Sequence, residues 1–380
     1  MAEYDRYLTE DSRGDFKHRN SVLNALHLDG WLLALLVALV TYGFFVLFSA
    51  SDGSQAALIR QARNFAIATV AMLVASQIRL DTYYRWAPLF YVAALLLLVA
   101  VPLFGVGAKG AQRWLSLGVI RFQPSELMKL AMPLMVASWF SRQGIPPRPR
   151  SLLGALMIIA LPAGLIVIQP DLGTSLLVAA SGLFVVFMAG VSWWYIAGAA
   201  TLFLMSAWPA WLFVLKDYQK QRILTLLDPE SDKLGAGWNI IQSKTAIGSG
   251  GWSGKGWLSG TQSHLDFLPE SQTDFIIAVL AEELGLRGVV LLLIIYALII
   301  WRGFAISVRA QTGFGRLLAS SITLTFFVYV FVNMGMVAGI LPVVGVPLPL
   351  VSAGGTSIVT LMLGFGVLMA VSAEKRVIRQ

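Results

Sequence analysis

Carboxylates, lysines, tryptophans and glycines gather in one polar stretch, residues 216–273, which apolar sequence encloses on both sides. Asp274 stands where this stretch meets the next apolar run. A carboxylate at such a boundary suits a general base, because it can lie within hydrogen-bond reach of a polar substrate. The structural alternative is a capping box over residues 271–274, in which Asp274 closes the start of a helix.

Three further charged residues stand inside apolar runs, where a charge at membrane depth is costly and indicates a functional site. On an ideal helix Glu282 lies about 80° round from Asp274, so we predict that both face one cavity. Glu126 and Lys129 are three residues apart and share a helix face, which predicts an ion pair. That pair either fixes packing or lines a polar cavity.

A glycine-rich segment, residues 247–257, resembles a phosphate-binding loop, but Ser249 and Gly256 break the pattern. The segment is therefore not a nucleotide site. Its backbone, with Lys244 and Lys255 beside it, is instead predicted to cradle a diphosphate.

Three other segments interrupt the apolar runs. Residues 107–121 alternate apolar and polar positions and are predicted to lie along the outer leaflet. In residues 169–175, Pro170 ends one helix and Asp171 caps the next, which predicts a turn. Prolines and glycines near 340–355 forbid a continuous helix, and we predict a re-entrant loop there.

The composition shows what must position these residues. Of 380 residues, 57% are hydrophobic and 13% charged, which indicates a polytopic helical membrane protein. The absence of cysteine excludes disulfides and thiol chemistry, and three scattered histidines form no metal site alone. A net charge of +8 suits contact with anionic membrane lipids. Its spread over many short loops does not indicate nucleic-acid binding.

We predict an all-α fold of ten transmembrane helices with a large outward loop between the seventh and eighth. The eighth span contains a predicted break, because charges and Gly285 interrupt it. The spans begin near Trp31, Asn64, Trp86, Ser125, Ser151, Thr174, Trp193, Asp274, Phe314 and Thr356.

Charge orients the spans. With both termini inside, the inner segments hold fifteen lysines and arginines and the short outer segments five, a clear positive-inside bias. The predicted order is a cytoplasmic tail (1–30), seven spans (31–215), the outward loop (216–273), three spans with the re-entrant loop (274–372) and a cytoplasmic tail (373–380).

Several motifs together resemble the RodA-like branch of the SEDS (shape, elongation, division and sporulation) family of bacterial membrane proteins. They are GAQRW with RFQPSE, QPDLGTS, AIGSGG with GKG, TDFIIAVLAEELG and GILPVVGVPLPLVSAGG, in order from about Trp31 to Arg376. The family's last loop usually reads S-Y-G-G, and Ala353 replaces that tyrosine here. We therefore assign no catalytic role to Ala353.

The resemblance implies a peptidoglycan glycosyltransferase of the cell inner membrane that polymerises lipid II on the outer face of that membrane, for elongation and rod shape. It places the family's required carboxylate at Asp274, the arginine of its QRW motif at Arg113 and its paired charges at Glu126 and Lys129. It also implies a class B penicillin-binding protein as transpeptidase partner, within the rod complex.

In the resulting hypothesis, Asp274 takes the proton from the acceptor sugar's 4-hydroxyl as that oxygen attacks the donor's anomeric carbon. Arg113, Lys129 or a bound divalent cation neutralises the departing diphosphate. The sequence identifies no cofactor with certainty. The main alternative is a flippase or transporter for the same lipid, and a further one is a scaffold for the transpeptidase.

Overall fold

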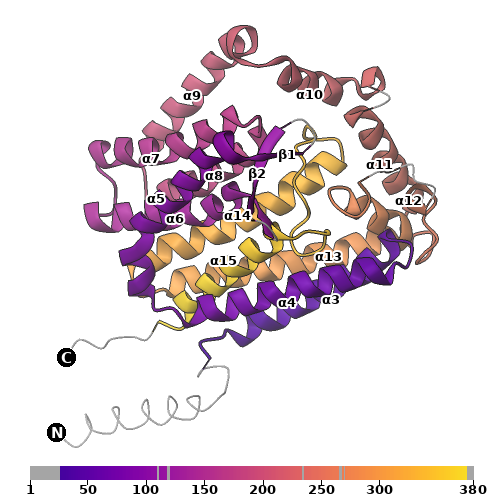
Figure 1. Ribbon diagram of the computed structural model, residues 1–380, viewed down its shortest axis with the longest axis horizontal. Helices are drawn as coiled ribbons and strands as arrows, with labels where there is room; N and C mark the ends of the chain where they lie inside the picture. Colours follow the sequence, from indigo (N-terminus) through magenta and orange to yellow (C-terminus); the bar gives the residue numbers. More distant parts are fainter. Residues whose placement is uncertain are drawn as a thin grey trace, which may run out of the picture.

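The computed structural model describes residues 26–108, 111–117, 120–232, 235–264, 268 and 270–374. Residues 1–25 and 375–380, which make up most of the two predicted tails, lie outside this described part. The rest is an all-α polytopic membrane fold with one small sheet (Figure 1).

The chain up to the polar stretch is mainly a run of long helices. They are α3 (Gly30–Ala50), α4 (Gln55–Gln77), α5 (Leu80–Phe104), α6 (Pro124–Gln143), α7 (Pro149–Ile168), α8 (Leu172–Met188) and α9 (Trp193–Pro209), which continues as the π-helical turn η2 (Ala210–Val214). Proline at the first turn starts α6 and α7. Asp29 and Ser54 cap α3 and α4 by accepting backbone N–H bonds.

The predicted outward loop is itself mostly ordered. It contains α10 (Asp217–Leu227), the 3-10 turn η3 (Pro229–Asp232), α11 (Ala236–Gly250) and the short α12 (Thr261–His264). Three helices follow: α13 (Ile276–Arg309), α14 (Gly313–Val337) and α15 (Thr356–Ser372).

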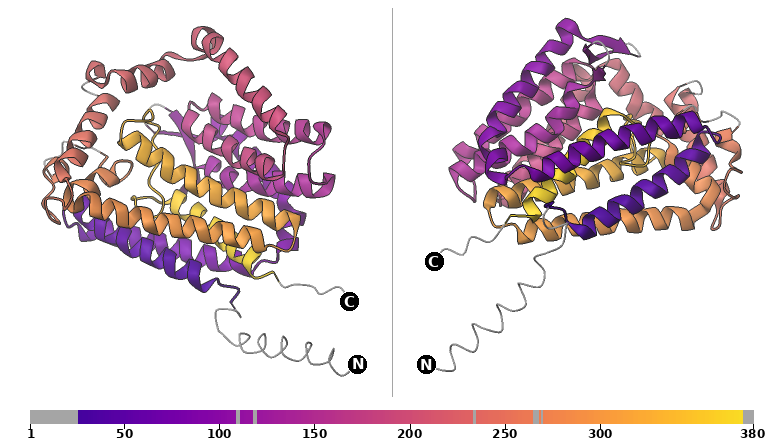
Figure 2. Two further views of the ribbon diagram at one scale, coloured as in Figure 1. Left: turned by 180° about the vertical axis from the view of Figure 1, so that it is seen from behind. Right: turned by 60° about the horizontal axis from the view of Figure 1, so that its bottom comes forward.

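The helices pack in pairs that bring distant parts of the chain together. Helix α13 contacts α3 and α14, α15 packs along α4, and α8 contacts α6, α7 and α14. Figure 2 shows α13 and α14 side by side, with α9, α10 and α11 forming an arc beyond one edge of the bundle. The core is apolar and includes the fully buried Phe140, Phe275 and Tyr296.

Seven helices among the described residues are long and apolar enough to cross a membrane: α3, α4, α5, α7, α9 with η2, α13 and α14. Helices α8 and α15 are apolar but shorter, at 17 residues each. Helix α6 has 20 residues and carries Glu126 and Lys129. These ten helices match the predicted order of spans, whereas the count of ten crossings stays a prediction. The start of α4, at Gln55, lies nine residues before the predicted Asn64.

The segment predicted to lie along the outer leaflet, residues 107–121, contains a small sheet that was not predicted, and its interfacial placement stays a prediction. Strands β1 (Val106–Ala108), β2 (Ala111–Leu117) and β3 (Ile120–Phe122) form an antiparallel sheet in the order β1-β2-β3. Trp114 pairs with Val106, and Leu115 pairs with Phe122. The alternation of apolar and polar residues reflects a pleated strand, whose side chains point alternately to two faces.

Candidate functional site

Asp274 lies in a turn directly before α13 and is half-buried. Its carbonyl oxygen accepts a hydrogen bond of 2.8 Å from Nδ2 of Asn333 on α14. The N-cap of α13 is Phe275, without a side-chain cap, and the Ser271 N–H donates to the Leu268 carbonyl oxygen. The capping box considered for residues 271–274 is therefore not at the start of the helix.

The irregular segment between α14 and α15, residues 338–355, surrounds this turn. The Ser352 hydroxyl donates to the Thr273 carbonyl oxygen, and the Ala353 N–H donates to the Gln272 carbonyl oxygen at 2.8 Å. Gly345 has a positive φ of 79°, and a β-carbon there would lie 3.5 Å from Asp274 Oδ2. The segment is non-helical, as predicted, and its residues 348–352 are all buried, whereas its re-entrant course stays a prediction. Ala353 makes its contact through the backbone.

Two carboxamide side chains on α4 hold the C-terminal part of this loop. Gln61 Nε2 donates to the Ser352 carbonyl oxygen at 3.1 Å, and Gln61 Oε1 accepts from the Gly354 N–H at 3.3 Å. Asn64 Nδ2 donates to the Gly354 carbonyl oxygen at 2.8 Å. The loop thus exchanges backbone hydrogen bonds for side-chain ones, as buried irregular backbone must.

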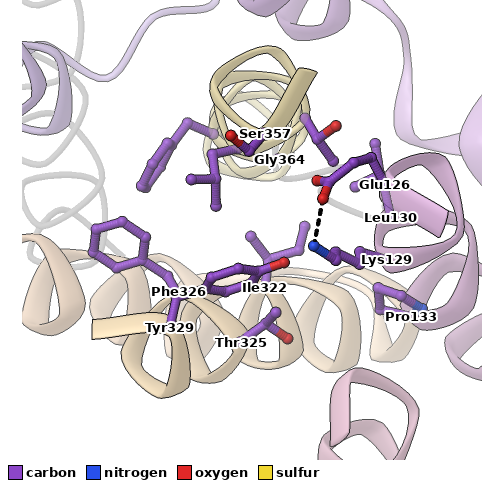
Figure 3. Close-up of a pocket in the computed structure, with 13 residues that line it drawn as sticks. Glu126, Lys129, Leu130, Pro133, Ile322, Thr325, Phe326, Tyr329, Ser357 and Gly364 are labelled. Atoms are coloured by element: carbon purple, nitrogen blue, oxygen red, sulfur yellow. Dashed lines mark hydrogen bonds and ion pairs between the residues drawn. The ribbon is translucent and has the colours of Figure 1, made fainter. Parts of the chain in front are cut away.

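Glu126 and Lys129 form the predicted ion pair, with Lys129 Nζ 2.6 Å from Glu126 Oε1 and both side chains buried. The ammonium group also lies 5.0 Å from the ring centroid of Tyr329 on α14. Figure 3 shows the pair facing a cavity between α6, α14 and α15.

That cavity has a volume of about 40 Å³, which is room for a few water molecules. Its polar lining includes Thr325, Ser357 and Thr360, and Thr325 Oγ1 has no hydrogen-bond partner among the described residues. The ion pair therefore links two side chains on one helix and lines a small cavity whose walls are mostly apolar.

Arg113, on β2, reaches the turn that the sequence predicted at residues 169–175. Its Nη2 donates to the Pro170 carbonyl oxygen at 2.6 Å, and its Nη1 lies 3.7 Å from Asp171 Oδ2. Asp171 Oδ1 accepts from the Thr174 N–H at 3.2 Å, which confirms the predicted cap of α8. Two separate motifs thus meet at one place, and about a third of the Arg113 side chain stays exposed.

Glu282 is where the prediction of a cavity shared with Asp274 is wrong. Its side chain is fully buried and accepts hydrogen bonds from Lys255 Nζ at 2.7 Å and from the Thr261 N–H and hydroxyl at 2.9 Å. The Gln262 N–H also donates to it at 3.2 Å. These donors come from the glycine-rich segment and α12, so Glu282 fastens the outer polar stretch to α13. Helix geometry alone could not show that these donors fill the space beside Glu282.

The glycine-rich segment also connects the polar stretch to α13. The N–H groups of Lys255 and Gly256 donate to the carbonyl oxygens of Glu282 and Glu283, both at 3.0 Å. They meet α13 where Gly285, with φ 65° and ψ −161°, breaks the helix as predicted. The backbone donors that would cradle a diphosphate are therefore used inside the protein, and Lys255 is paired with Glu282.

Lys244, on α11, and Lys255 are both exposed, and Lys255 is paired with Glu282. Its ammonium nitrogen would lie 2.6 Å from a β-carbon at Gly339, in the turn where the loop around Asp274 begins. The adjacent Ser243 hydroxyl donates to the Val337 carbonyl oxygen at 2.9 Å and fixes α11 on the end of α14. Of the two lysines predicted to bind a diphosphate, Lys255 is engaged by Glu282, and the role of Lys244 stays a prediction.

The structure also contains functional candidates that the sequence analysis missed. Asn333 and Tyr329 are one turn apart on α14 and contact the Asp274 turn and Lys129 respectively. Gln61 is a polar residue buried within an apolar span, and that was the available signal. Within the described ranges, no three acidic or histidine side chains are grouped to hold a metal ion, and the divalent cation stays a prediction.

Comparison with known proteins gives consistent relatives over nearly the whole chain. A family model described as a cell cycle protein, FtsW/RodA/SpoVE, matches residues 30–377. Peptidoglycan glycosyltransferase MrdB of Escherichia coli (strain K12) is 52% identical over 364 residues, covering 96% of this chain and 98% of MrdB. A probable peptidoglycan glycosyltransferase FtsW of Alkalilimnicola ehrlichii is 37% identical, covering 92% and 90%.

Solved structures agree. A chain of a peptidoglycan synthase complex, described as coordinating polymerization and crosslinking, superposes with a TM-score of 0.80 at 32% identity. It covers 90% of this chain and 97% of that one. The rod shape determining protein RodA of Thermus thermophilus superposes with a TM-score of 0.69 at 28% identity, covering 90% and 96%.

Proposed function

This chain belongs to the FtsW/RodA/SpoVE family of cell cycle proteins, the SEDS family, and we propose that Asp274 is the general base of its peptidoglycan glycosyltransferase reaction. The observation that carries this proposal is the placement of the carboxylate. Asp274 ends the polar stretch, is half-buried, and is enclosed by the irregular loop rather than used as a helix cap.

The substrates in this proposal are two lipid II molecules. Asp274 removes the proton of the acceptor sugar's 4-hydroxyl while that oxygen attacks the anomeric carbon of the donor. The bond from the anomeric carbon to the carrier diphosphate breaks, and the diphosphate leaves with the electron pair. Attack opposite the leaving group inverts the anomeric centre. The leaving group is already activated, so the reaction needs no nucleotide.

Exposed cations are proposed to receive the diphosphate. Lys244 lies at the start of the loop that surrounds Asp274, and Arg113 keeps part of its side chain accessible. Lys129 and Glu126 are supporting residues, since their pair is buried beside a small, mostly apolar cavity. A divalent cation, if bound, would supply further charge neutralisation, and its requirement is tested by chelation.

The proposed setting is the bacterial inner membrane, with both termini cytoplasmic and Asp274 at the outer surface. The charge bias of the loops supports this orientation. A class B penicillin-binding protein within the elongation complex is the proposed partner. The similarity to a chain of a complex that combines polymerization and crosslinking supports it.

The first prediction tests the base. Asp274→Ala in the purified protein should lower glycan formation from lipid II by at least about 10²–10⁴-fold, the usual contribution of a general base. Glycan chains are counted on gels, and thermal unfolding in detergent checks that the variant is folded. Full activity of the variant contradicts the proposal.

The same assay separates this function from the transport alternative. Detergent micelles have no second compartment, so a flippase would leave lipid II monomeric in them. Glycan formation by wild-type protein alone, or with its transpeptidase partner inhibited by a β-lactam, is expected for the transferase only.

A further inference from the structure

Asn333 is a fully buried carboxamide on α14 that touches the site through both of its amide hydrogens. Nδ2 donates to the Asp274 carbonyl oxygen at 2.8 Å and to the Val346 carbonyl oxygen at 2.7 Å. Its exposed fraction is 0%. The Asn333 side chain thus joins the turn that carries Asp274 to the irregular loop of residues 338–355.

The two bonds connect the main chain of Asp274 to the main chain of the loop next to its carboxylate. Val346 follows Gly345, the position whose β-carbon would lie 3.5 Å from Asp274 Oδ2. By holding the carbonyl groups of Asp274 and Val346, Asn333 fixes Asp274 next to Gly345. Few side chains could do this, because the task needs two hydrogens on one short planar group and an uncharged donor in a buried place.

The acceptor end of Asn333 supports the same assignment. Oδ1 is buried and has no hydrogen-bond partner among the described residues. Leaving a buried amide oxygen unpaired is unfavourable, so the residue has no stabilising advantage from that end. The side chain is oriented for its two donor contacts.

Helix α14 also links this anchor to the buried ion pair. Tyr329 is one turn before Asn333 on the same face and contacts Lys129. A single rigid helix therefore fixes the relative positions of Asp274 and the Lys129 cavity.

We propose that Asn333 is a positioning residue for catalysis, which holds Asp274 at the depth and angle from which it reaches the acceptor hydroxyl. This inference rests on the proposed role of Asp274. Asn333 itself touches no substrate in this proposal, and its effect is exerted through the main chain of Asp274 and Val346.

The test compares Asn333→Leu, which keeps the approximate volume and removes both donors, with Asn333→Gln, which retains them. Ser321→Ala is the matched control: Ser321 is fully buried on the same helix, donates one hydrogen bond of 2.7 Å to the Ser181 carbonyl oxygen and lies three turns from Asn333. The folded fraction of each variant is quantified by size-exclusion chromatography, and lipid II polymerisation is measured with equal amounts of folded protein.

The expected result is a split between kinetic constants. Misplacement of a catalytic group by about 1 Å can cost about 10²-fold, so Asn333→Leu should lower kcat about 10- to 100-fold. KM for lipid II should change by less than about 3-fold, since substrate contacts are retained, and Asn333→Gln should recover part of kcat. Ser321→Ala should keep kcat within about 2-fold.

The inference is overturned by wild-type kcat in Asn333→Leu or by an equal loss of kcat in Ser321→Ala. If Asn333→Leu does not fold, Asn333→Asp takes its place, because it keeps the shape and loses the paired donors; wild-type kcat there overturns the inference equally. Asp274→Asn, measured in parallel, separates the two proposals: activity in that variant removes the role of Asp274, whereas its inactivity beside an active Asn333→Leu removes only the role of Asn333.

Discussion

At the scale of single residues, buried carboxylates do different work at the two ends of the bundle. Asp29 receives the Arg302 guanidinium through Nε at 3.0 Å and Nη2 at 2.6 Å, the Ser372 hydroxyl at 3.2 Å and the Leu32 N–H at 2.9 Å. It therefore joins the ends of α3, α13 and α15. Glu282 fastens the outer polar stretch to α13 in a comparable way. Asp274 is half-buried, and it is the carboxylate for which we propose a catalytic role.

Asp29 gives a prediction with a pH dependence. Burial raises the pKa of its carboxyl group, but the hydrogen bonds from Arg302, Leu32 and Ser372, together with the Arg302 charge, outweigh burial and hold the pKa below the ordinary 3.8. A lowered folded-state pKa contributes stability above the unfolded value, and that contribution is lost as pH falls through the folded pKa. Asn at this position keeps the helix cap and removes the charge.

We expect Asp29→Asn to lower the free energy of unfolding by about 3 kcal/mol at pH 7, the cost of breaking a buried ion pair. The difference from wild type should shrink as pH falls below 3.8, measured by thermal unfolding in detergent across pH. A difference that is constant down to acid pH contradicts the role given to the charge.

Glu282→Gln tests the contact between α13 and the polar stretch. The change leaves Lys255 without its carboxylate and replaces one acceptor oxygen by a donor facing the Thr261 and Gln262 N–H groups. We expect a loss of about 2 kcal/mol, less than for a wholly buried pair because Lys255 is partly exposed. Limited proteolysis within residues 251–264 should become faster. Unchanged proteolysis and melting would show that the junction is held by backbone contacts alone.

Sequence reasoning found those residue contacts that are local. The Glu126–Lys129 pair and the Asp171 cap involve residues three apart, and helix geometry fixes such spacings. It missed the partners of Asn333 and Glu282, which are 59 and 27 residues away and depend on how helices pack. No periodicity encodes those distances.

At the scale of elements, the broken helix α13 determines the position of Asp274, which lies directly before it. Its first part, residues 276–283, is entirely buried, and residues 286–309 continue as a long helix with many exposed apolar side chains. The glycine-rich segment packs against the break. A β-carbon on Gly285 would collide with the backbone N of Gly254 and lie 2.7 Å from the Trp252 carbonyl oxygen.

Gly285→Ala should therefore be strongly destabilising. The backbone angles of Gly285 lie in a region that only glycine occupies readily, at a cost of about 1–3 kcal/mol for another residue, and the collision adds to it. Gly248→Ala on α11, where a β-carbon meets nothing within 4 Å, is the matched control and should cost nothing. Similar melting temperatures for the two variants would contradict the assigned role of the break.

Among the elements, the long apolar helices and the break were predictable because each has a local signal. The small sheet was not recognised. Its strands have three to seven residues, and alternation over so short a length is equally compatible with a surface segment. The polar stretch reads as a loop because its helices are short and rich in glycine and charge, and tertiary contacts with α13 order them.

At the scale of the whole molecule, the helices divide into a packed bundle and a peripheral arc. Within the described chain, α9 has no buried residue, and its Leu204, Met205 and Trp208 are each 72% exposed. Such a surface is stable only against lipid or another apolar surface. Exposed apolar side chains on α4, α5, α7 and α13 as well support its assignment as an integral membrane protein.

The absence of cysteine makes the proposed orientation directly testable. Single cysteines are introduced at Ser253, exposed in the outer polar stretch, and at Gln311, exposed between α13 and α14. A membrane-impermeant maleimide should label Ser253→Cys in intact spheroplasts and Gln311→Cys only after permeabilisation. Neither position belongs to the proposed site, so polymerisation should remain normal. The reverse labelling pattern contradicts the outward placement of Asp274.

The break at Gly285 has one more consequence, for how the protein responds to its host bilayer. A spanning helix that is longer or shorter than the hydrocarbon layer adjusts by tilting. In α13 the lipid-facing part can tilt about a non-helical joint, while the buried part stays with its packing neighbours. Turnover should therefore vary little among vesicles of different acyl-chain length, because membrane thickness is not transmitted to the depth of the acid.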